Sequence, residues 1–215
     1  MKRLSLLAIL LISIINVNAQ GIGEIAPEKP PEKFPPNAIG ADIIFNNGGI
    51  GLGSFYKRTI SDELTFITAF SISEAKADNE FTRIDPYTYQ TYTVGKKNRI
   101  FLIPITFGLQ YRIFQNSLYD NLRPFIETGI GPSFVITTPY ELEYFNSFGK
   151  AHNNIALGSY IGLGADFGIN KSSLVALNVR YYIVHLFNDG VESLYGVKEN
   201  NFGGIFINLS LGIMY

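Results

Sequence analysis

Histidine and cysteine, which supply many catalytic groups and metal ligands, are scarce in this 215-residue chain. It has no cysteine, which excludes a disulfide framework and any thiolate metal site. The two histidines are His152 and His185. A histidine that acts as a general base needs a nucleophile within hydrogen-bond reach, and none can be assigned to either residue. The sequence therefore predicts no enzyme, no metal site and no bound cofactor.

Charged side chains offer a different chemistry, which is ion pairing inside the fold. Six of them, three acids and three bases, alternate along their segments with the apolar side chains. If that side lines a narrow interior, each charge loses hydration and needs a partner. We expect Arg112 to pair with Glu127. We expect Asp166 to pair with Arg180. The alternative is that several charges, Lys57 and Arg112 first, lie in water at the rims. The predicted charge network is Asp42, Lys57, Arg112, Glu127, Asp166 and Arg180.

The elements that position these charges are segments of about ten residues with alternating apolar side chains, a pattern typical of barrel strands. Three long connections, 75–98, 137–153 and 188–202, fall on one side of the predicted sheet, and short turns fall on the other. Transmembrane barrels show this asymmetry. The pattern predicts an all-β fold, an eight-stranded antiparallel up-and-down transmembrane β-barrel. The predicted strands are 38–46, 50–58, 63–74, 99–113, 122–136, 154–169, 173–187 and 203–215.

The last stretch, 203–215, reads GGIFINLSLGIMY and ends on an aromatic residue. A soluble lipocalin-like barrel or a sandwich would show the same alternation, but its termini would usually be frayed and polar. The stretch resembles the C-terminal strand of bacterial outer-membrane barrels, in which a terminal aromatic residue is the assembly signal. The resemblance implies this role for Tyr215.

Aromatic residues are expected to form belts at both ends of the barrel, where the membrane meets water. The belt at the short-turn end is predicted to be Tyr56, Tyr111, Phe167 and Tyr215, and the opposite belt Phe45, Phe70, Phe134 and Phe187. The other face of these strands is rich in glycine, for example Gly158, Gly162 and Gly164. An eight-stranded barrel has an interior that side chains can fill, and glycines leave room there for larger groups.

The chain before the barrel divides into two segments. Residues 1–19 have a basic start, an apolar run too short to span a membrane and a small residue at the end, which predicts a signal peptide. An uncleaved anchor is the alternative. Residues 20–37 contain five prolines and predict an extended periplasmic linker. The barrel domain is then 38–215.

Two strands carry a family resemblance. Residues 123–135, RPFIETGIGPSFV, look like the Y-x-x-x-G-x-G strand of the outer-membrane β-barrel domain family, and residues 100–113, IFLIPITFGLQYRI, are similar to its strand with a central Ile-Pro. The resemblance covers 38–215. It implies a small outer-membrane-protein-A-like or porin-family barrel in the cell outer membrane. The implied partners are outer-membrane lipid, lipopolysaccharide and the barrel-assembly machinery, and the implied oligomeric state is a monomer.

Lys96, Lys97 and Arg99 follow the longest connection, where they would meet lipopolysaccharide phosphates at the outer leaflet. A solvated basic rim is the alternative. Some eight-stranded barrels deacylate lipid A with a histidine and a serine two positions apart. Neither histidine here has a serine at that spacing, so a lipid A-modifying enzyme is the least favoured hypothesis.

The net charge of −1 gives no indication of a nucleic-acid partner. The favoured function is a structural or interaction protein with a side-chain-filled lumen and outer loops that contact an extracellular ligand. The alternative is a narrow porin-like channel for small or apolar solutes. Aromatic side chains favour recognition surfaces. The loop tyrosines are Tyr87, Tyr89, Tyr92, Tyr140, Tyr144 and Tyr195.

Overall fold

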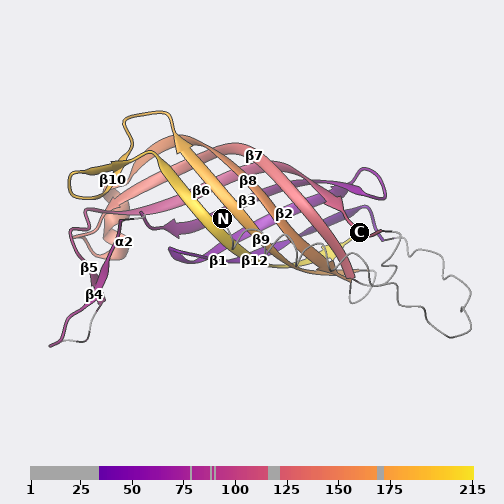
Figure 1. Cartoon of the computed structure of the whole chain (residues 1–215), viewed down its shortest axis with the longest axis horizontal. Helices are drawn as coiled ribbons and strands as arrows, with labels where there is room; N and C mark the ends of the chain where they lie inside the picture. The colour runs from indigo at the N-terminus through magenta and orange to yellow at the C-terminus, as the bar shows by residue number, and fades with distance from the viewer. Residues whose placement is uncertain (1–33, 78, 88, 90, 116–121, 169–171) are drawn as a thin grey trace, which may run out of the picture. The chain divides into compact units, whose positions relative to one another are not determined.

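The fold is a closed antiparallel β-barrel. The computed structural model describes residues 34–77, 79–87, 89, 91–115, 122–168 and 172–215. Eight long strands close in the order β1-β12-β9-β8-β7-β6-β3-β2, so each strand pairs with its neighbours along the chain (Figure 1). The fold class and all eight predicted strands are confirmed. The strands are β1 (Asn37–Asn46), β2 (Gly49–Thr59), β3 (Leu64–Ala75), β6 (Asn98–Arg112), β7 (Leu122–Pro139), β8 (His152–Phe167), β9 (Ser173–Leu186) and β12 (Asn201–Met214).

The first and last strands close the barrel. Their register runs from Ala38 opposite Met214 to Phe45 opposite Ile207. Beyond it, the backbone amide of Tyr215 donates to the carbonyl oxygen of Asn37 at 2.9 Å, and the amide of Asn37 donates to the carbonyl of Tyr215 at 3.2 Å. Closure leaves no unpaired strand edge, which is the condition for placing a sheet in lipid. The predicted signal peptide, 1–19, and residues 20–33 of the predicted linker lie outside the described residues.

The connections differ between the two ends of the barrel. Segments 76–97, 140–151 and 187–200 join strands at one end, called here the loop end, and the other end, the short-turn end, has shorter connections. The tight turn between β1 and β2 also lies at the loop end. There the Asn46 side-chain oxygen accepts hydrogen bonds from the backbone amides of Gly48 and Gly49 at 2.8 and 3.0 Å.

The long loops contain structure that the sequence did not predict. They hold the hairpin of β4 (Thr82–Ile84) and β5 (Thr91–Thr93), the short helices α2 (Tyr144–Ser147) and η2 (Phe148–Lys150), and the hairpin of β10 (Val191–Leu194) and β11 (Val197–Glu199). Figure 1 shows the β4–β5 hairpin extending away from the barrel wall. No helix in the described part of the chain has both the length and the hydropathy needed to cross a bilayer.

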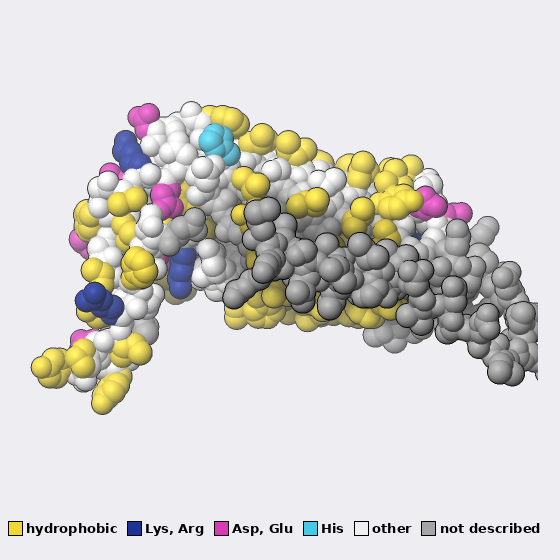
Figure 2. All heavy atoms as spheres, viewed as in Figure 1, with side chains coloured by type: hydrophobic (Ala, Val, Ile, Leu, Met, Phe, Trp, Pro, Cys, Tyr) yellow, Lys and Arg dark blue, Asp and Glu magenta, His cyan; other side chains and the backbone are white. Residues whose placement is uncertain are grey.

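The two faces of the barrel wall differ in exposure. Inward side chains form the core, and large ones such as Ile67 and Phe125 are 1% exposed. Many outward side chains are large, apolar and exposed, with Ile161 at 67% and Leu163 at 64%. Figure 2 shows hydrophobic side chains along the wall, between charged side chains at its two ends. This is the reverse of a water-soluble barrel, whose outer face would be polar.

Candidate functional site

Glu127 and Arg180 form an ion pair inside the barrel. Arg180 donates from Nε to Glu127 Oε1 at 2.7 Å and from Nη2 to Oε2 at 3.0 Å. Their side chains are 0% and 4% exposed. The pair bridges β7 and β9 over Gly162 of β8, which stands in register with both residues. A Cβ on Gly162 would lie 2.9 Å from Arg180 Cγ, so the glycine makes room for the arginine.

Aromatic rings fill the lumen beside this ion pair. Tyr160, Tyr182 and Phe206 stand on three consecutive strands, with centroid distances of 5.0 Å between the tyrosines and 4.7 Å from Tyr182 to Phe206. The Arg180 guanidinium lies 4.7 Å from the Tyr160 centroid, a cation–π distance. A Cβ on Gly129 would lie 2.5 Å from Tyr160 Cε1. Glycines on this face therefore admit larger side chains, as expected from the sequence.

Lys57 and Asp166 form a second buried pair, nearer the short-turn end. Lys57 Nζ donates to Asp166 Oδ1 at 2.8 Å, and Gln110 Nε2 donates to Asp166 Oδ2 at 2.8 Å. The lysine is on β2 and the aspartate on β8, four strands apart in the eight-strand ring. The pair therefore crosses the lumen from one wall to the opposite wall.

Asp42 is the third acid inside the barrel and is 3% exposed. It accepts a hydrogen bond from Ser210, which faces it across β1 and β12, and the charges of Arg180 and Lys57 act on it. Asp42 thus lies within the field of both ion pairs.

The two predicted pairings are wrong. Glu127 pairs with Arg180 and Asp166 pairs with Lys57. Lys57 is buried, with 6% exposure, as its place in the predicted charge network requires, and the alternative that put it in water at the rim is wrong. The reason is geometric: alternation along a strand tells which face a residue is on, whereas partners in the lumen depend on strand tilt and on side-chain reach across it.

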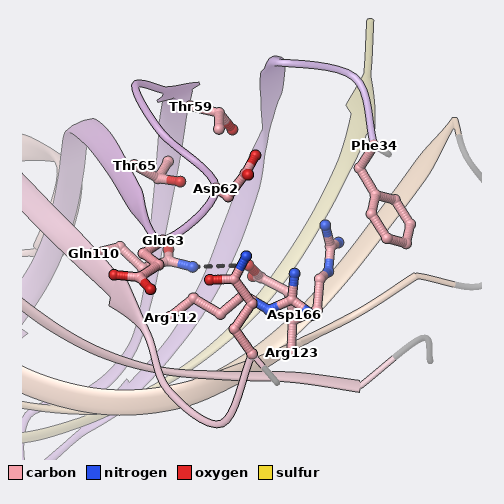
Figure 3. A pocket seen from close by; sticks show the side chains of 10 residues that line it. Phe34, Thr59, Asp62, Glu63, Thr65, Gln110, Arg112, Arg123 and Asp166 are labelled. Atoms are coloured by element: carbon pink, nitrogen blue, oxygen red, sulfur yellow. Dashed lines mark hydrogen bonds between the residues drawn. The ribbon is translucent and has the colours of Figure 1, made fainter. Parts of the chain in front are cut away.

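Arg112 lines a cavity of about 280 Å³ in the short-turn end (Figure 3). Gln110, Arg123 and Asp166 line the same cavity. The guanidinium of Arg123 lies 3.9 Å from the centroid of Phe34, which covers this end of the core. Arg123 and Gln110 were not among the predicted lumen residues, although both share the inward parity of the predicted charges.

The basic residues at the loop end make contacts within the loops. Lys96 Nζ donates to Glu80 Oε2 at 2.7 Å, and the two side chains are 3% and 1% exposed. Lys97 pairs with Glu192 and is 41% exposed. Arg99 donates to the carbonyl oxygen of Pro139, the last residue of β7, at 3.1 Å and to that of Leu142 in the following loop at 3.2 Å. Contact with lipopolysaccharide phosphates stays a prediction, and Lys96 could join it only by leaving Glu80.

Glu80 connects two loops. Its carboxylate accepts hydrogen bonds from Lys96 Nζ, from Ser193 Oγ of the β10–β11 hairpin and from the backbone amide of Ala77. Burial raises the pKa of Glu80, but these hydrogen bonds together outweigh burial, so its pKa lies below the usual value. The ionised carboxylate is therefore the form that holds the loops together.

The two histidines lie at the protein surface. Both are exposed, and His185 Nδ1 lies 2.7 Å from Asn201 Oδ1, with its ring centroid 5.2 Å from that of Phe187. Among the residues that the structure describes, no group of three His, Cys, Asp or Glu side chains could hold a metal ion.

The residues of the predicted belts lie on the outer face. Tyr111, Phe167 and Tyr215, at the short-turn end, are 44%, 40% and 58% exposed, and Tyr56 is half-buried with its hydroxyl donating to Asn37 Oδ1 at 3.0 Å. In the other predicted belt, Phe45, Phe70 and Phe187 are exposed and Phe134 is half-buried. Phe70 lies on β3 between Ser54 and Ile105, away from the strand ends, so its place in a belt at the loop end is wrong.

The fold and lumen together define a class, a closed eight-stranded barrel with an apolar outer face. No family model matches the chain, and no curated protein matches it. The solved structures that are similar to the chain include the following three. Neisserial surface protein A has 12% identity and a TM-score of 0.49, covering 85% of this chain and 97% of that one. The N-terminal barrel domain of Pseudomonas aeruginosa OprF has 10% identity and a TM-score of 0.46, covering 84% and 98%. OprG of Pseudomonas aeruginosa has 15% identity and a TM-score of 0.42, covering 86% of this chain and 98% of that one. These values are too low to transfer a role.

Proposed function

We propose that the protein is a small outer-membrane β-barrel with a closed lumen, which acts as a structural or interaction protein through its loops. The observation that carries the proposal is the lumen itself. The Glu127–Arg180 ion pair and the ring of Tyr160 lie buried in it on three adjacent strands, and Lys57–Asp166 crosses it between opposite walls.

A membrane location is supported by the outer face of β6. Every outward residue from Phe101 to Tyr111 is apolar or aromatic. At about 3.3 Å per residue and a tilt of about 40°, this stretch rises by about 25 Å, which is the height of the apolar band of transmembrane barrels. A face of this kind is stable in lipid and costly in water.

The orientation follows from the two ends. Outer-membrane barrels have short periplasmic turns and long external loops. We therefore assign the short-turn end to the periplasm and the loop end to the outside. Tyr215, at the short-turn end, is then in place for recognition by the assembly machinery, which stays a prediction from its resemblance to terminal aromatic residues.

The loops present aromatic side chains to the outside. Tyr87 is 92% exposed, Tyr89 83% and Tyr195 58%. Rings held on short hairpins supply contact area at a low cost in conformational entropy, which suits recognition of another molecule. The identity of that ligand is left to experiment.

The location is tested by electrophoresis. A closed barrel satisfies its backbone hydrogen bonds internally and resists detergent. The folded protein should therefore migrate differently in SDS before and after boiling, after recovery from outer-membrane fractions. Recovery as a detergent-free soluble monomer would contradict the proposal. Conductance across a planar bilayer separates the closed lumen from the alternative, a narrow channel.

A further inference from the structure

One outward residue of the barrel wall is covered by a loop. On β6, the outward residues Phe107, Leu109 and Tyr111 are 44–48% exposed, whereas Phe101 is 5% exposed. Its ring centroid lies 6.0 Å from that of Tyr144 in α2 and 5.2 Å from that of Phe148 in η2. Residues 144–150, called here the wall segment, therefore pack against the outside of the barrel near the loop end (Figure 1).

The wall segment exposes more rings than it buries. Phe145 is 82% exposed, and Tyr144 and Phe148 are each 42% exposed. Phe145 packs edge-on against Tyr144, with centroids 5.5 Å apart. Since Phe101 is the wall residue beneath, these rings continue the apolar surface of the wall outward. An 82% exposed phenylalanine on this side faces whatever surrounds the barrel.

The height of the wall segment corresponds to a membrane surface. Phe101 lies about 25 Å above the belt residue Tyr111, so the segment stands where the apolar band ends. Charges of both signs accompany it: Lys150, its last residue, is exposed, and so is Glu143, the residue before it. Two positions beyond Phe101, the Arg99 guanidinium lies 4.8 Å and 5.5 Å from the ring centroids of Tyr140 and Tyr144. Rings flanked by cations are typical of interfacial anchors.

We propose that the wall segment is a lipid anchor at the outer surface of the membrane. Phe145 enters the boundary between headgroups and acyl chains, while Tyr144 and Lys150 lie at the level of the headgroups. Arg99 contacts the segment through the ring of Tyr144, and its hydrogen bonds to Pro139 and Leu142 fix the chain that leads into the segment. This inference rests on the proposed outer-membrane location and adds a lipid contact made by a loop.

The chain contains no tryptophan, so a single introduced tryptophan reports on one site without background. Three variants are compared: Phe145→Trp in the wall segment, Ile161→Trp on the barrel wall and Tyr87→Trp in the β4–β5 hairpin. Each is reconstituted in phosphatidylcholine vesicles that carry bromine either near the headgroup or near the bilayer centre. Heat-dependent migration in SDS shows that each variant has folded.

If the segment is an anchor, bromine near the headgroup should quench the tryptophan fluorescence of Phe145→Trp. The quenched fraction should be as large as that of Ile161→Trp in brominated lipid. The anchor predicts little loss to the deep bromine and no loss for Tyr87→Trp. If Ile161→Trp is quenched and Phe145→Trp is not, the anchor is wrong and the membrane location stands. If folded Ile161→Trp is itself unquenched, the location is wrong. An unquenched, blue-shifted Phe145→Trp whose spectrum changes with protein-to-lipid ratio would show contact with a second copy and would overturn the anchor.

Discussion

Two ion pairs of this protein, Glu127–Arg180 in the lumen and Lys97–Glu192 at the loop end, lie in different surroundings. In the lumen, Arg180 and Glu127 stand on long strands and are 4% and 0% exposed. At the loop end, Lys97 and Glu192 join two loops and are 41% and 23% exposed. The same chemistry therefore has different consequences, because water screens the second pair and is excluded from the first. The Glu127–Arg180 pair therefore joins strands inside the barrel, whereas the Lys97–Glu192 pair joins two loops at the surface.

The comparison predicts its largest effect at Arg180. Arg180→Ala leaves Glu127 buried without its partner and should lower the free energy of unfolding by about 3–5 kcal/mol. The measurement is the denaturant midpoint in detergent. Arg58→Ala, at an exposed position of β2, is the matched control and should change the midpoint little. Equal midpoints for the two variants would mean that the pair does not stabilise the barrel.

Packing around the lumen gives a second contrast. Gly129→Ala places a methyl group 2.5 Å from the ring of Tyr160, which is held between Arg180 and Tyr182. Overpacking of this kind costs about 1–3 kcal/mol. Gly149→Ala is the control, since a Cβ there meets nothing within 4 Å. The yield of heat-shifted, folded protein and its denaturant midpoint should fall for the first variant alone.

Glu80 makes the loop end sensitive to pH. Its pKa is lowered from the usual 4.5, so the folded form gains stability from the carboxylate above pH 4.5 and loses it as the pH falls toward the lowered pKa. Hydrogen exchange of the Lys97 and Tyr195 amides, which bond to Ser193 and Gly95 across the loops, should quicken at acidic pH relative to strand amides. Glu80→Gln should show the quicker exchange at neutral pH as well. An acid response that persists unchanged in Glu80→Gln would assign it to another group.

The smallest effect is expected at Lys97. Its pair with Glu192 is partly exposed, and pairs of this kind contribute about 0–1 kcal/mol. Lys97→Ala should leave the unfolding midpoint within that range, and added salt should reduce the difference further. A loss as large as that of Arg180→Ala would remove the contrast between the two regions.

The sequence was sufficient to predict the barrel and insufficient to predict its contacts. Strands such as β8 and β12 alternate over 14 or more residues, so their faces could be assigned from sequence. The hairpins β4–β5 and β10–β11 have strands of three or four residues. They show no usable period, and cross-loop contacts support them, for example the Lys97 amide to the Ser193 carbonyl at 2.7 Å.

The candidate site shows the same limit. Parity placed Lys57 and Asp166 on the inner face, but the two residues are 109 positions apart and meet from opposite walls. A pattern of neighbouring residues cannot predict a contact between residues so far apart in the sequence. Glu127 and Arg180 were each paired with a residue on an adjacent strand in the prediction, whereas the observed pair spans a glycine on the strand between them. Parity therefore predicts which residues face the lumen, and the tilt of the closed barrel decides which of them touch.

The closed lumen is tested most directly by conductance of the purified protein in a planar bilayer. The unmutated protein should show no steady conductance, because the Glu127–Arg180 pair and the Tyr160 ring are buried in the interior and Lys57–Asp166 crosses it. Arg180→Ala should show openings under the same voltage, whereas Lys97→Ala, at the loop end, should remain silent. Steady conductance from the unmutated protein, unchanged in Arg180→Ala, would contradict the closed lumen and establish a channel.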